Sequence, residues 1–182
     1  MNVLLLSMPD SFEHMPSLGI RMPNGGLTSI AGNQDPHHRV AVADLILVQR
    51  SVRETVTRLV RELHPEVVGL SIMTFQRPTA ARIIELVRSL QPGTKIVVGG
   101  YDPSLAPEAY EALSVDYLIR GEGEVTFREL LRALEQDSRG EDVCGLSYRK
   151  ADKWVHNPPR APHRLESGEI SLPKRDARLL KG

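Results

Sequence analysis

The stretch KIVVGGYDPSLAPEAYEAL, residues 95–113, changes character at Gly99-Gly100. Ile96-Val97-Val98 is typical of a buried strand, whereas the residues from Tyr101 onward favour a helix. Glycines at such a boundary either form a tight corner or leave room for a ligand against the backbone. This stretch alone leaves both interpretations open.

Four other short apolar runs share the character of Ile96-Val97-Val98: residues 3–6, 40–43, 67–72 and 117–119. None of them alternates with polar residues, which favours parallel strands covered on both faces. Helical stripes over residues 52–63 and 78–90 separate some of these runs, and another over 125–134 follows the last run. We therefore predict an α/β fold: a doubly wound, five-stranded parallel sheet of flavodoxin-like or Rossmann-like type, flanked by helices, with strand order 2-1-3-4-5.

The pattern changes after about residue 140. Short β-prone pieces at 146–149 and 154–155 predict a C-terminal hairpin. The residues that follow are rich in proline, glycine and charge and show no periodic apolar face. We interpret them as a connector that packs on another domain.

Composition narrows the range of functions. The 182 residues carry no net charge, so neither nucleic acid nor an anionic membrane is an expected partner. One cysteine, Cys144, excludes an internal disulfide framework and a cysteine-rich metal site within these residues. The start MNVLLLSMPD lacks a basic region and a cleavage site, and no apolar run reaches membrane-spanning length. We expect a cytoplasmic protein.

Small and flexible residues follow four of the predicted strands, in the segments 7–26, 71–78, 99–108 and 120–124. In an open parallel sheet, ligands bind at the carboxyl ends of the strands. The common phosphate-binding motifs are absent: no Gly-x-Gly-x-x-Gly follows the first strand, and no P-loop occurs. A receiver domain is also excluded, because the required Asp after the third strand and Lys after the fifth are missing.

Five motifs together resemble one known family: LLLSMP at 4–9, PSLG at 16–19, VGLSIMT at 68–74, IVVGGYDPSLAPE at 96–108 and YLIRGEGEVTFRELLRAL at 117–134. They look like the cobalamin-binding domain that precedes the catalytic barrel of cobalamin-dependent radical SAM enzymes. The resemblance implies a cobalamin-binding domain over residues 1–140. It also implies a hairpin and connector over 141–182, leading towards a radical SAM barrel that these residues do not contain.

The resemblance implies cobalamin as cofactor here, with a [4Fe–4S] cluster and S-adenosylmethionine only in the missing catalytic domain. The dimethylbenzimidazole tail is then withdrawn from cobalt into a slot lined by Ser71 and Gly99. Thr74, Phe75 and Gln76 face the macrocycle, and residues 121–124 close the site. The implied cofactor-binding residues are Pro9, Leu18, Gly19, Ser71, Met73, Thr74, Phe75, Gln76, Gly99, Gly100, Tyr101, Gly121, Glu122, Gly123 and Glu124.

Structural alternatives stay open for several of these residues. Gly121-Glu122-Gly123-Glu124 also fits a turn followed by a helix start, where glutamates are favourable. Ser71 also fits a hydrogen-bonded core hydroxyl, and Arg77 fits a solvated residue of a first helical turn.

In one class of cobalamin domain, the histidine of an Asp-x-His-x-x-Gly motif binds cobalt. The segment Asp35-Pro36-His37-His38 partly matches this motif. The final glycine is missing, and the segment precedes the second strand, at the edge away from the site. His64 lies at that same edge. His14 alone falls in a loop at the correct edge, where a histidine is more often solvated than bound to a metal. We therefore expect base-off binding without a protein histidine, no protein metal ligand and no catalytic residue in this chain.

Two other functions remain open at this point. One is a degenerate domain that binds no corrin and recognises a substrate or partner. The other is a flavodoxin-like binder of another nucleotide cofactor.

Overall fold

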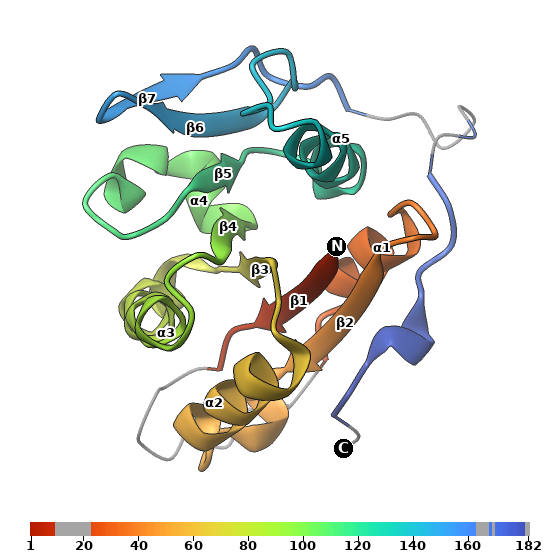
Figure 1. The fold of residues 1–182 in the computed structure, drawn as a ribbon, viewed down its shortest axis with the longest axis vertical. Coiled ribbons are helices and arrows are strands. Elements are labelled where there is room, and N and C mark those ends of the chain that lie inside the picture. Colours follow the sequence, from red (N-terminus) through yellow and green to blue (C-terminus); the bar gives the residue numbers. More distant parts are fainter. Residues whose placement is uncertain (10–22, 163–167, 169, 181–182) are drawn as a thin grey trace.

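The computed structural model describes residues 1–9, 23–162, 168 and 170–180. They form an α/β fold around one sheet with strand order β2-β1-β3-β4-β5-β6-β7 (Figure 1). The first five strands are parallel, as predicted, and the C-terminal hairpin adds two antiparallel strands beside β5. The fold class and the order of the first five strands are confirmed, and the sheet has two more strands than predicted. The strands are β1 Asn2–Ser7, β2 Arg39–Asp44, β3 Val67–Ser71, β4 Lys95–Gly99, β5 Tyr117–Ile119, β6 Leu146–Lys150 and β7 Lys153–His156.

Helices cover both faces of the sheet, with α1 and α5 on one side and α2 and α3 on the other (Figure 1). The predicted helices appear close to their expected bounds, but α1 falls at the end of a segment that the sequence indicates as a loop. Within the described part of the chain, every helix is too short or too polar to cross a lipid bilayer. The helices are α1 Gly25–Gly32, α2 Val52–Leu63, α3 Arg77–Leu90, α4 Tyr101–Leu105 and α5 Gly123–Glu135, with short 3₁₀ turns η1 Leu45–Val48, η2 Thr74–Gln76, η3 Pro107–Tyr110 and η5 Arg175–Ala177.

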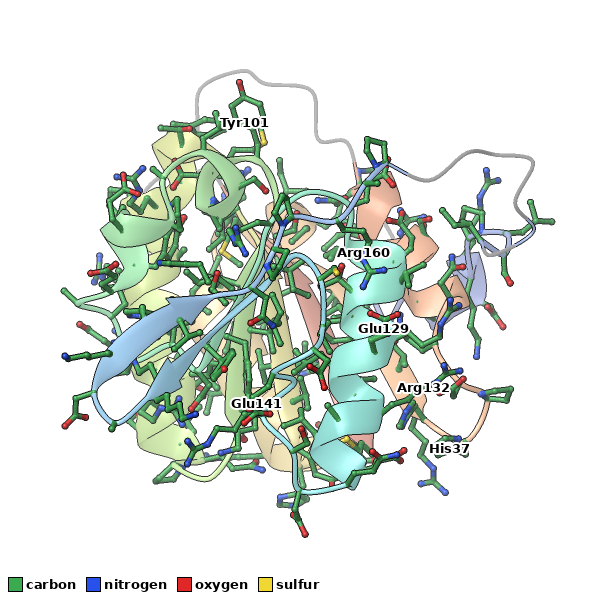
Figure 2. All side chains as sticks on the ribbon, turned by 90° about the horizontal axis from the view of Figure 1, so that it is seen from above. His37, Tyr101, Glu129, Arg132, Glu141 and Arg160 are labelled. Atoms are coloured by element: carbon green, nitrogen blue, oxygen red, sulfur yellow. The ribbon has the colours of Figure 1, made fainter. Side chains whose placement is uncertain are left out.

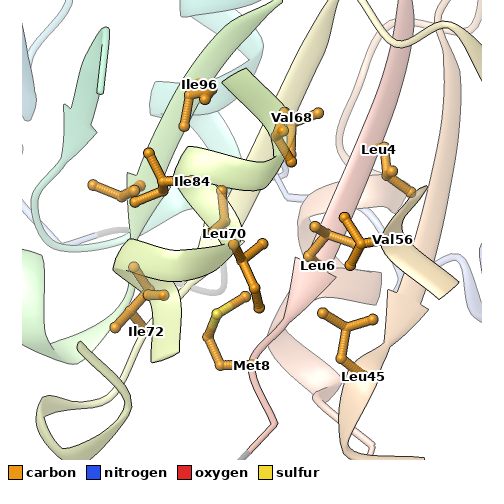
Figure 3. Close-up of a cluster of buried hydrophobic side chains, with 14 of the residues drawn as sticks. Leu4, Leu6, Met8, Leu45, Val56, Val68, Leu70, Ile72, Ile84 and Ile96 are labelled. Carbon is orange, nitrogen blue, oxygen red and sulfur yellow. The ribbon is translucent and has the colours of Figure 1, made fainter. Parts of the chain in front are cut away.

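Buried side chains form a core on each face of the sheet. Successive residues of a strand point to opposite faces, so Leu4 and Leu6 pack towards α2 and α3, whereas Leu5 packs towards α1 and α5. Figure 3 shows the first of these cores, in which residues from β1, β3 and β4 meet Val56 of α2 and Ile84 of α3.

Residues 170–180, which we call the C-terminal segment, run along the outer side of α1 and β2 (Figure 1). The Lys174 amide donates to the Thr28 carbonyl at 2.8 Å, and the Leu179 amide donates to the Val42 carbonyl at 2.9 Å. Part of the predicted connector therefore packs on this domain itself.

The two glycines after β4 have different roles in the corner that leads to α4. Gly100 has a φ of 102°, and a Cβ there would lie 2.8 Å from the Ile72 amide nitrogen. A Cβ on Gly99 would lie 3.6 Å from the Cβ of Ile119, which is an ordinary contact. The corner therefore requires glycine at 100, whereas the protein leaves room for a Cβ at 99.

A buried ion pair fixes α4 to the start of α3. Arg77 donates two hydrogen bonds of 2.7 Å to Asp102, whose side chain is only 2% exposed. Tyr110 donates a third bond of 2.6 Å to the same carboxylate. The bonds from Arg77 lower the pKa of Asp102 and outweigh the opposing effect of burial. These contacts hold the segments that follow β3 and β4 in one arrangement.

We expect Gly100→Ala to lower the free energy of unfolding by about 1–3 kcal/mol, because alanine is strained at this φ and its Cβ meets backbone atoms. Gly99→Ala should stay within about 1 kcal/mol of the wild type. Urea denaturation followed by circular dichroism measures both values. Equal losses for the two variants would contradict the assignment of the corner to Gly100.

We expect Asp102→Asn to lower the free energy of unfolding at pH 7 by about 2–3 kcal/mol, less than a fully buried pair, because Arg77 stays partly solvated. The pKa of Asp102 is lower in the folded chain than in the unfolded chain, where it is about 3.9. Its contribution is therefore present above about pH 4 and is lost as the pH falls through the folded value.

The measurement is urea denaturation of both proteins between pH 7 and pH 3. The difference between them should shrink towards pH 3, while the exposed control Asp142→Asn should match the wild type throughout. A difference that stays constant down to pH 3 would show that the charge of Asp102 does not stabilise the fold.

Candidate functional site

A cleft of about 180 Å³ opens at the carboxyl ends of β3 and β4, between α1 and α5. Most of its lining is apolar, and glycines occur in every part of it. Parallel sheets bind ligands at this edge, so the cleft lies where the sequence predicts a site. Its lining residues are Leu5, Gly26, Leu27, Ile30, Gly69, Leu70, Ser71, Val97, Gly99, Gly100, Ile119, Gly121, Gly123, Glu124 and Phe127.

Three small residues form the floor of the cleft. Gly69 and Ser71 lie two residues apart on β3, so they face the same side of the sheet. Gly99 of β4 pairs with Ser71 in the parallel register. A Cβ on Gly69 would lie 2.7 Å from the end of the Leu5 side chain. The cleft therefore exists because side chains are missing where α1 and α5 cross the strand ends.

Helices α1 and α5 form the two walls. Asn24 caps α1, since its side-chain oxygen accepts a hydrogen bond of 3.3 Å from the Leu27 amide. The walls approach each other closely at Gly123, where a Cβ would lie 3.0 Å from the end of the Ile30 side chain. Glycine at the start of α5 thus lets the two helices converge beside the floor.

Apolar side chains are exposed along the same edge, beside the cleft. Met73 and Phe75 follow β3, and Tyr101 and Leu105 belong to α4, which follows β4. These four side chains are 46% to 64% exposed. Figure 2 shows Tyr101 at one end of the molecule, with Arg132 and His37 at the opposite end. We call these four residues the apolar rim.

Most of the predicted site residues lie at this edge. Thr74 is exposed between Met73 and Phe75, Glu122 is the N-cap of α5, and Pro9 is buried just after β1. Leu18 and Gly19 lie outside the described residues. The predicted residues that line the cleft are Ser71, Gly99, Gly100, Gly121, Gly123 and Glu124.

Gln76 and Arg77 have structural partners. The Gln76 side chain is buried, and its amide accepts a bond of 3.0 Å from the Met73 amide and donates one of 3.3 Å to the Met8 carbonyl. It therefore points into the loop and not outward, which differs from the orientation expected for contact with a macrocycle. Arg77 is partly exposed, but its guanidinium pairs with Asp102, and Arg77 does not line the cleft.

The histidine segment lies at the opposite edge of the sheet, before β2, as expected. His37 meets Glu135 at 2.8 Å, and Asp35 pairs with Arg132 through two bonds of 2.7 Å. Burial lowers the pKa of His38. These contacts join the turn before β2 to the end of α5, and none of the four described histidines lines the cleft.

Several lining residues were not predicted from the sequence. Gly69 is the most informative, because a glycine inside a strand indicates a close approach of another group. The α1 residues Gly26, Leu27 and Ile30 were missed together with their helix. The signal for α1 is Asn24 followed by an apolar pair at helical spacing, Leu27 and Ile30.

Comparison with curated proteins finds relatives that are considerably longer than this chain. An uncharacterized methyltransferase, PH0819, of Pyrococcus horikoshii is 27% identical over 178 residues, which are 97% of this chain and 38% of that protein. An anaerobic magnesium-protoporphyrin IX monomethyl ester cyclase of Synechocystis is 29% identical over 171 residues, covering 87% of this chain and 33% of that protein. The chain thus spans less than two fifths of the length of either relative.

Solved structures show the same fold. The cobalamin-dependent S-adenosylmethionine radical enzyme OxsB, with aqua-cobalamin and S-adenosylmethionine bound, superposes with a TM-score of 0.76 at 21% identity, over 96% of this chain and 24% of that one. The radical S-adenosylmethionine methyltransferase TsrM from Kitasatospora setae, with cobalamin and a [4Fe–4S] cluster bound, gives a TM-score of 0.74 at 21% identity, over 95% of this chain and 31% of that one.

A family model matches the greater part of the chain. The match spans residues 15–131, from before α1 into α5, and so includes the floor and both walls of the cleft. Its description is "B12 binding domain". The chain therefore belongs to the family of B12-binding domains.

Proposed function

We propose that this chain binds cobalamin at the carboxyl edge of its sheet, with the nucleotide tail in the cleft and the corrin over the apolar rim. The observation that carries the proposal is the floor of Gly69, Ser71 and Gly99, which leaves a narrow apolar slot between α1 and α5. The family match over residues 15–131 supports it. Bound cobalamin would supply a cobalt centre that carries an alkyl group or takes part in radical chemistry.

The cleft suits the flat base of a nucleotide tail. Its walls and floor are mostly apolar, which favours burial of an aromatic base. Ser71 and Glu124 are the polar side chains in the lining, and they are available to hydrogen-bond the ribose, phosphate or amide groups. Gly99 supports the proposal most directly, because no protein atom prevents a Cβ there.

The apolar rim suits a broad macrocycle. Met73, Phe75 and Tyr101 are exposed to water in the free chain. An apolar ring system that covers them removes their apolar surface from water, which favours binding. The Arg77–Asp102 pair below fixes both segments that carry the rim. A rim held in this way would meet the ligand with little loss of conformational freedom.

We further propose base-off binding without a protein histidine below cobalt. Of the histidines that the structure describes, His37, His38 and His64 lie at the amino edge, and His156 ends β7, which β6 separates from β5. His14 lies outside the described residues, so the proposal for that histidine rests on the sequence alone. The exposed residues that follow β3 offer a thioether, a hydroxyl and an aromatic ring, none of which is imidazole. A tail base placed in the cleft is in addition unavailable to cobalt.

We propose that the chain serves as the cofactor-binding part of a longer radical SAM enzyme, one that performs methyl transfer or other radical chemistry. Its length relative to the curated proteins supports this. The 182 residues contain one cysteine, Cys144, so the three-cysteine motif of a radical SAM cluster must come from another domain.

The test is retention of hydroxocobalamin by the purified chain. The protein is mixed with hydroxocobalamin and desalted, and the visible spectrum of the protein fraction is recorded. We expect corrin bands from the wild type and a loss of at least about tenfold in affinity for Gly99→Val, because valine fills the slot. Circular dichroism checks that the variant is folded.

Gly93→Val is the matched control. Gly93 lies in the turn before β4, at the opposite edge, where nothing lies within 4 Å of an added Cβ. This variant should retain cobalamin like the wild type. A folded Gly99→Val that binds cobalamin with unchanged affinity would overturn the placement of the tail. A wild type without corrin bands would overturn cobalamin binding and favour a degenerate domain or a binder of another nucleotide.

A further inference from the structure

The C-terminal segment contacts the outer side of the helix that forms one wall of the cleft. A Cβ on Gly32, the last residue of α1, would lie only 2.1 Å from the Leu172 carbonyl oxygen. Asn33 holds the segment next to this point, since its side chain accepts a bond of 2.6 Å from the Ser171 amide and donates one of 3.1 Å to the Ser171 carbonyl. Helix α1 is thus packed between the segment and the cleft.

The same segment neutralises a buried charge. The Asp44 carboxylate at the end of β2 is fully buried, with 0% of its side chain exposed. The Arg178 Nε donates to one of its oxygens at 2.9 Å, and the Asn24 backbone amide donates to the other at 2.8 Å. Without Arg178, this carboxylate would lose its paired cation in the protein interior, which is strongly unfavourable.

Asn24 connects this ion pair to the floor of the cleft. Its carbonyl accepts a bond of 3.2 Å from Arg178, and its side-chain nitrogen donates one of 3.2 Å to the Ser71 hydroxyl. Asn24 also caps α1. A continuous set of hydrogen bonds therefore runs from Arg178 through Asp44 and Asn24 to Ser71, which lies against the ligand in the proposed complex.

We infer that Arg178 is a positioning residue for the cofactor cleft, and that docking of the C-terminal segment and binding of cobalamin favour each other. The inference rests on the proposed function. With the segment docked, Arg178 fixes Asn24, the start of α1 and the Ser71 hydroxyl in the geometry that the cleft requires. With the segment undocked, Asp44 is unpaired and the outer support of α1 is lost. A ligand that needs the ordered wall binds the docked state more tightly, and by linkage it strengthens docking by the same factor.

With this coupling, the affinity for the cofactor would depend on whether the C-terminal segment is docked. The cleft would be fully formed only when residues 170–180 lie along α1 and β2. Whatever displaces that segment would also loosen the cofactor.

Two measurements on the 182-residue chain test the inference. The first is amide hydrogen exchange of Leu179 and Lys174, whose N–H groups bond to Val42 and Thr28. Saturating hydroxocobalamin should slow both, although neither residue lines the cleft. The second is the hydroxocobalamin affinity of Arg178→Gln, which we expect to be about 5- to 50-fold weaker than that of the wild type.

Two further variants separate positioning from general destabilisation. Arg175→Ala removes an exposed arginine of the same segment and should leave the affinity unchanged. If Arg178 acts through Asn24, Arg178→Gln should weaken binding much less in an Asn24→Ala background than in the wild type. Additive losses would overturn the route through Asn24.

The outcomes distinguish this inference from the proposed function. A wild type that binds hydroxocobalamin, together with a folded Arg178→Gln of equal affinity and unchanged exchange at Leu179, would overturn the coupling and leave the proposed function intact. If Arg178→Gln fails to fold, the exchange measurement on the wild type decides alone. A wild type that does not bind hydroxocobalamin would overturn both.

Discussion

The parallel register of β3 and β4 is the constraint on which the site depends. It places Ser71 beside Gly99, with Gly69 two residues earlier on the same face. Because these residues are small, α1 and α5 converge over the strand ends without filling the space between them and the sheet. Elsewhere on this face larger side chains such as Val67 and Leu131 fill the interior, so the cleft is confined to the carboxyl edge.

Two buried carboxylates stabilise the elements around this cleft. Asp102 follows β4 and holds the start of α3 through Arg77, while Asp44 ends β2 and holds the entry to α1 and the C-terminal segment through Asn24 and Arg178. Burying either aspartate without a cation is unfavourable, so the folded chain must keep each aspartate next to its own arginine. One pair fixes the segments that carry the apolar rim, and the other fixes a wall. The two sides of the site are therefore held by separate ion pairs, Arg77–Asp102 and Arg178–Asp44, which share no residue.

The sequence predicted the five parallel strands, but neither the extension of the sheet by the C-terminal hairpin nor all of the site. Apolar runs such as Ile96-Val97-Val98 predicted the five parallel strands, because burial on both faces leaves a clear pattern. Their order was predicted from the flavodoxin-like fold type and not from the runs themselves. Helix α1 was missed, since it is short and begins with two glycines, which favour a loop. The sequence of the C-terminal segment has no periodic apolar pattern from which its docking could be predicted. Backbone groups, such as the Lys174 and Leu179 amides, hold the segment in place instead. The added strands of the hairpin depend on pairing with β5, which no local pattern specifies.

The adjacent glycines at 99 and 100 have different explanations: the fold requires one of them, whereas it does not require the other. At Gly100 the backbone angle and the nearby Ile72 backbone exclude a side chain, so the fold itself accounts for the residue. At Gly99 the nearest protein atom leaves space for a Cβ, yet the residue lies on the floor of the cleft. A small residue that the surrounding protein does not require is better explained by the group that occupies the space beside it. For that reason Gly99, and not the Gly-Gly pair as a whole, supports cofactor binding.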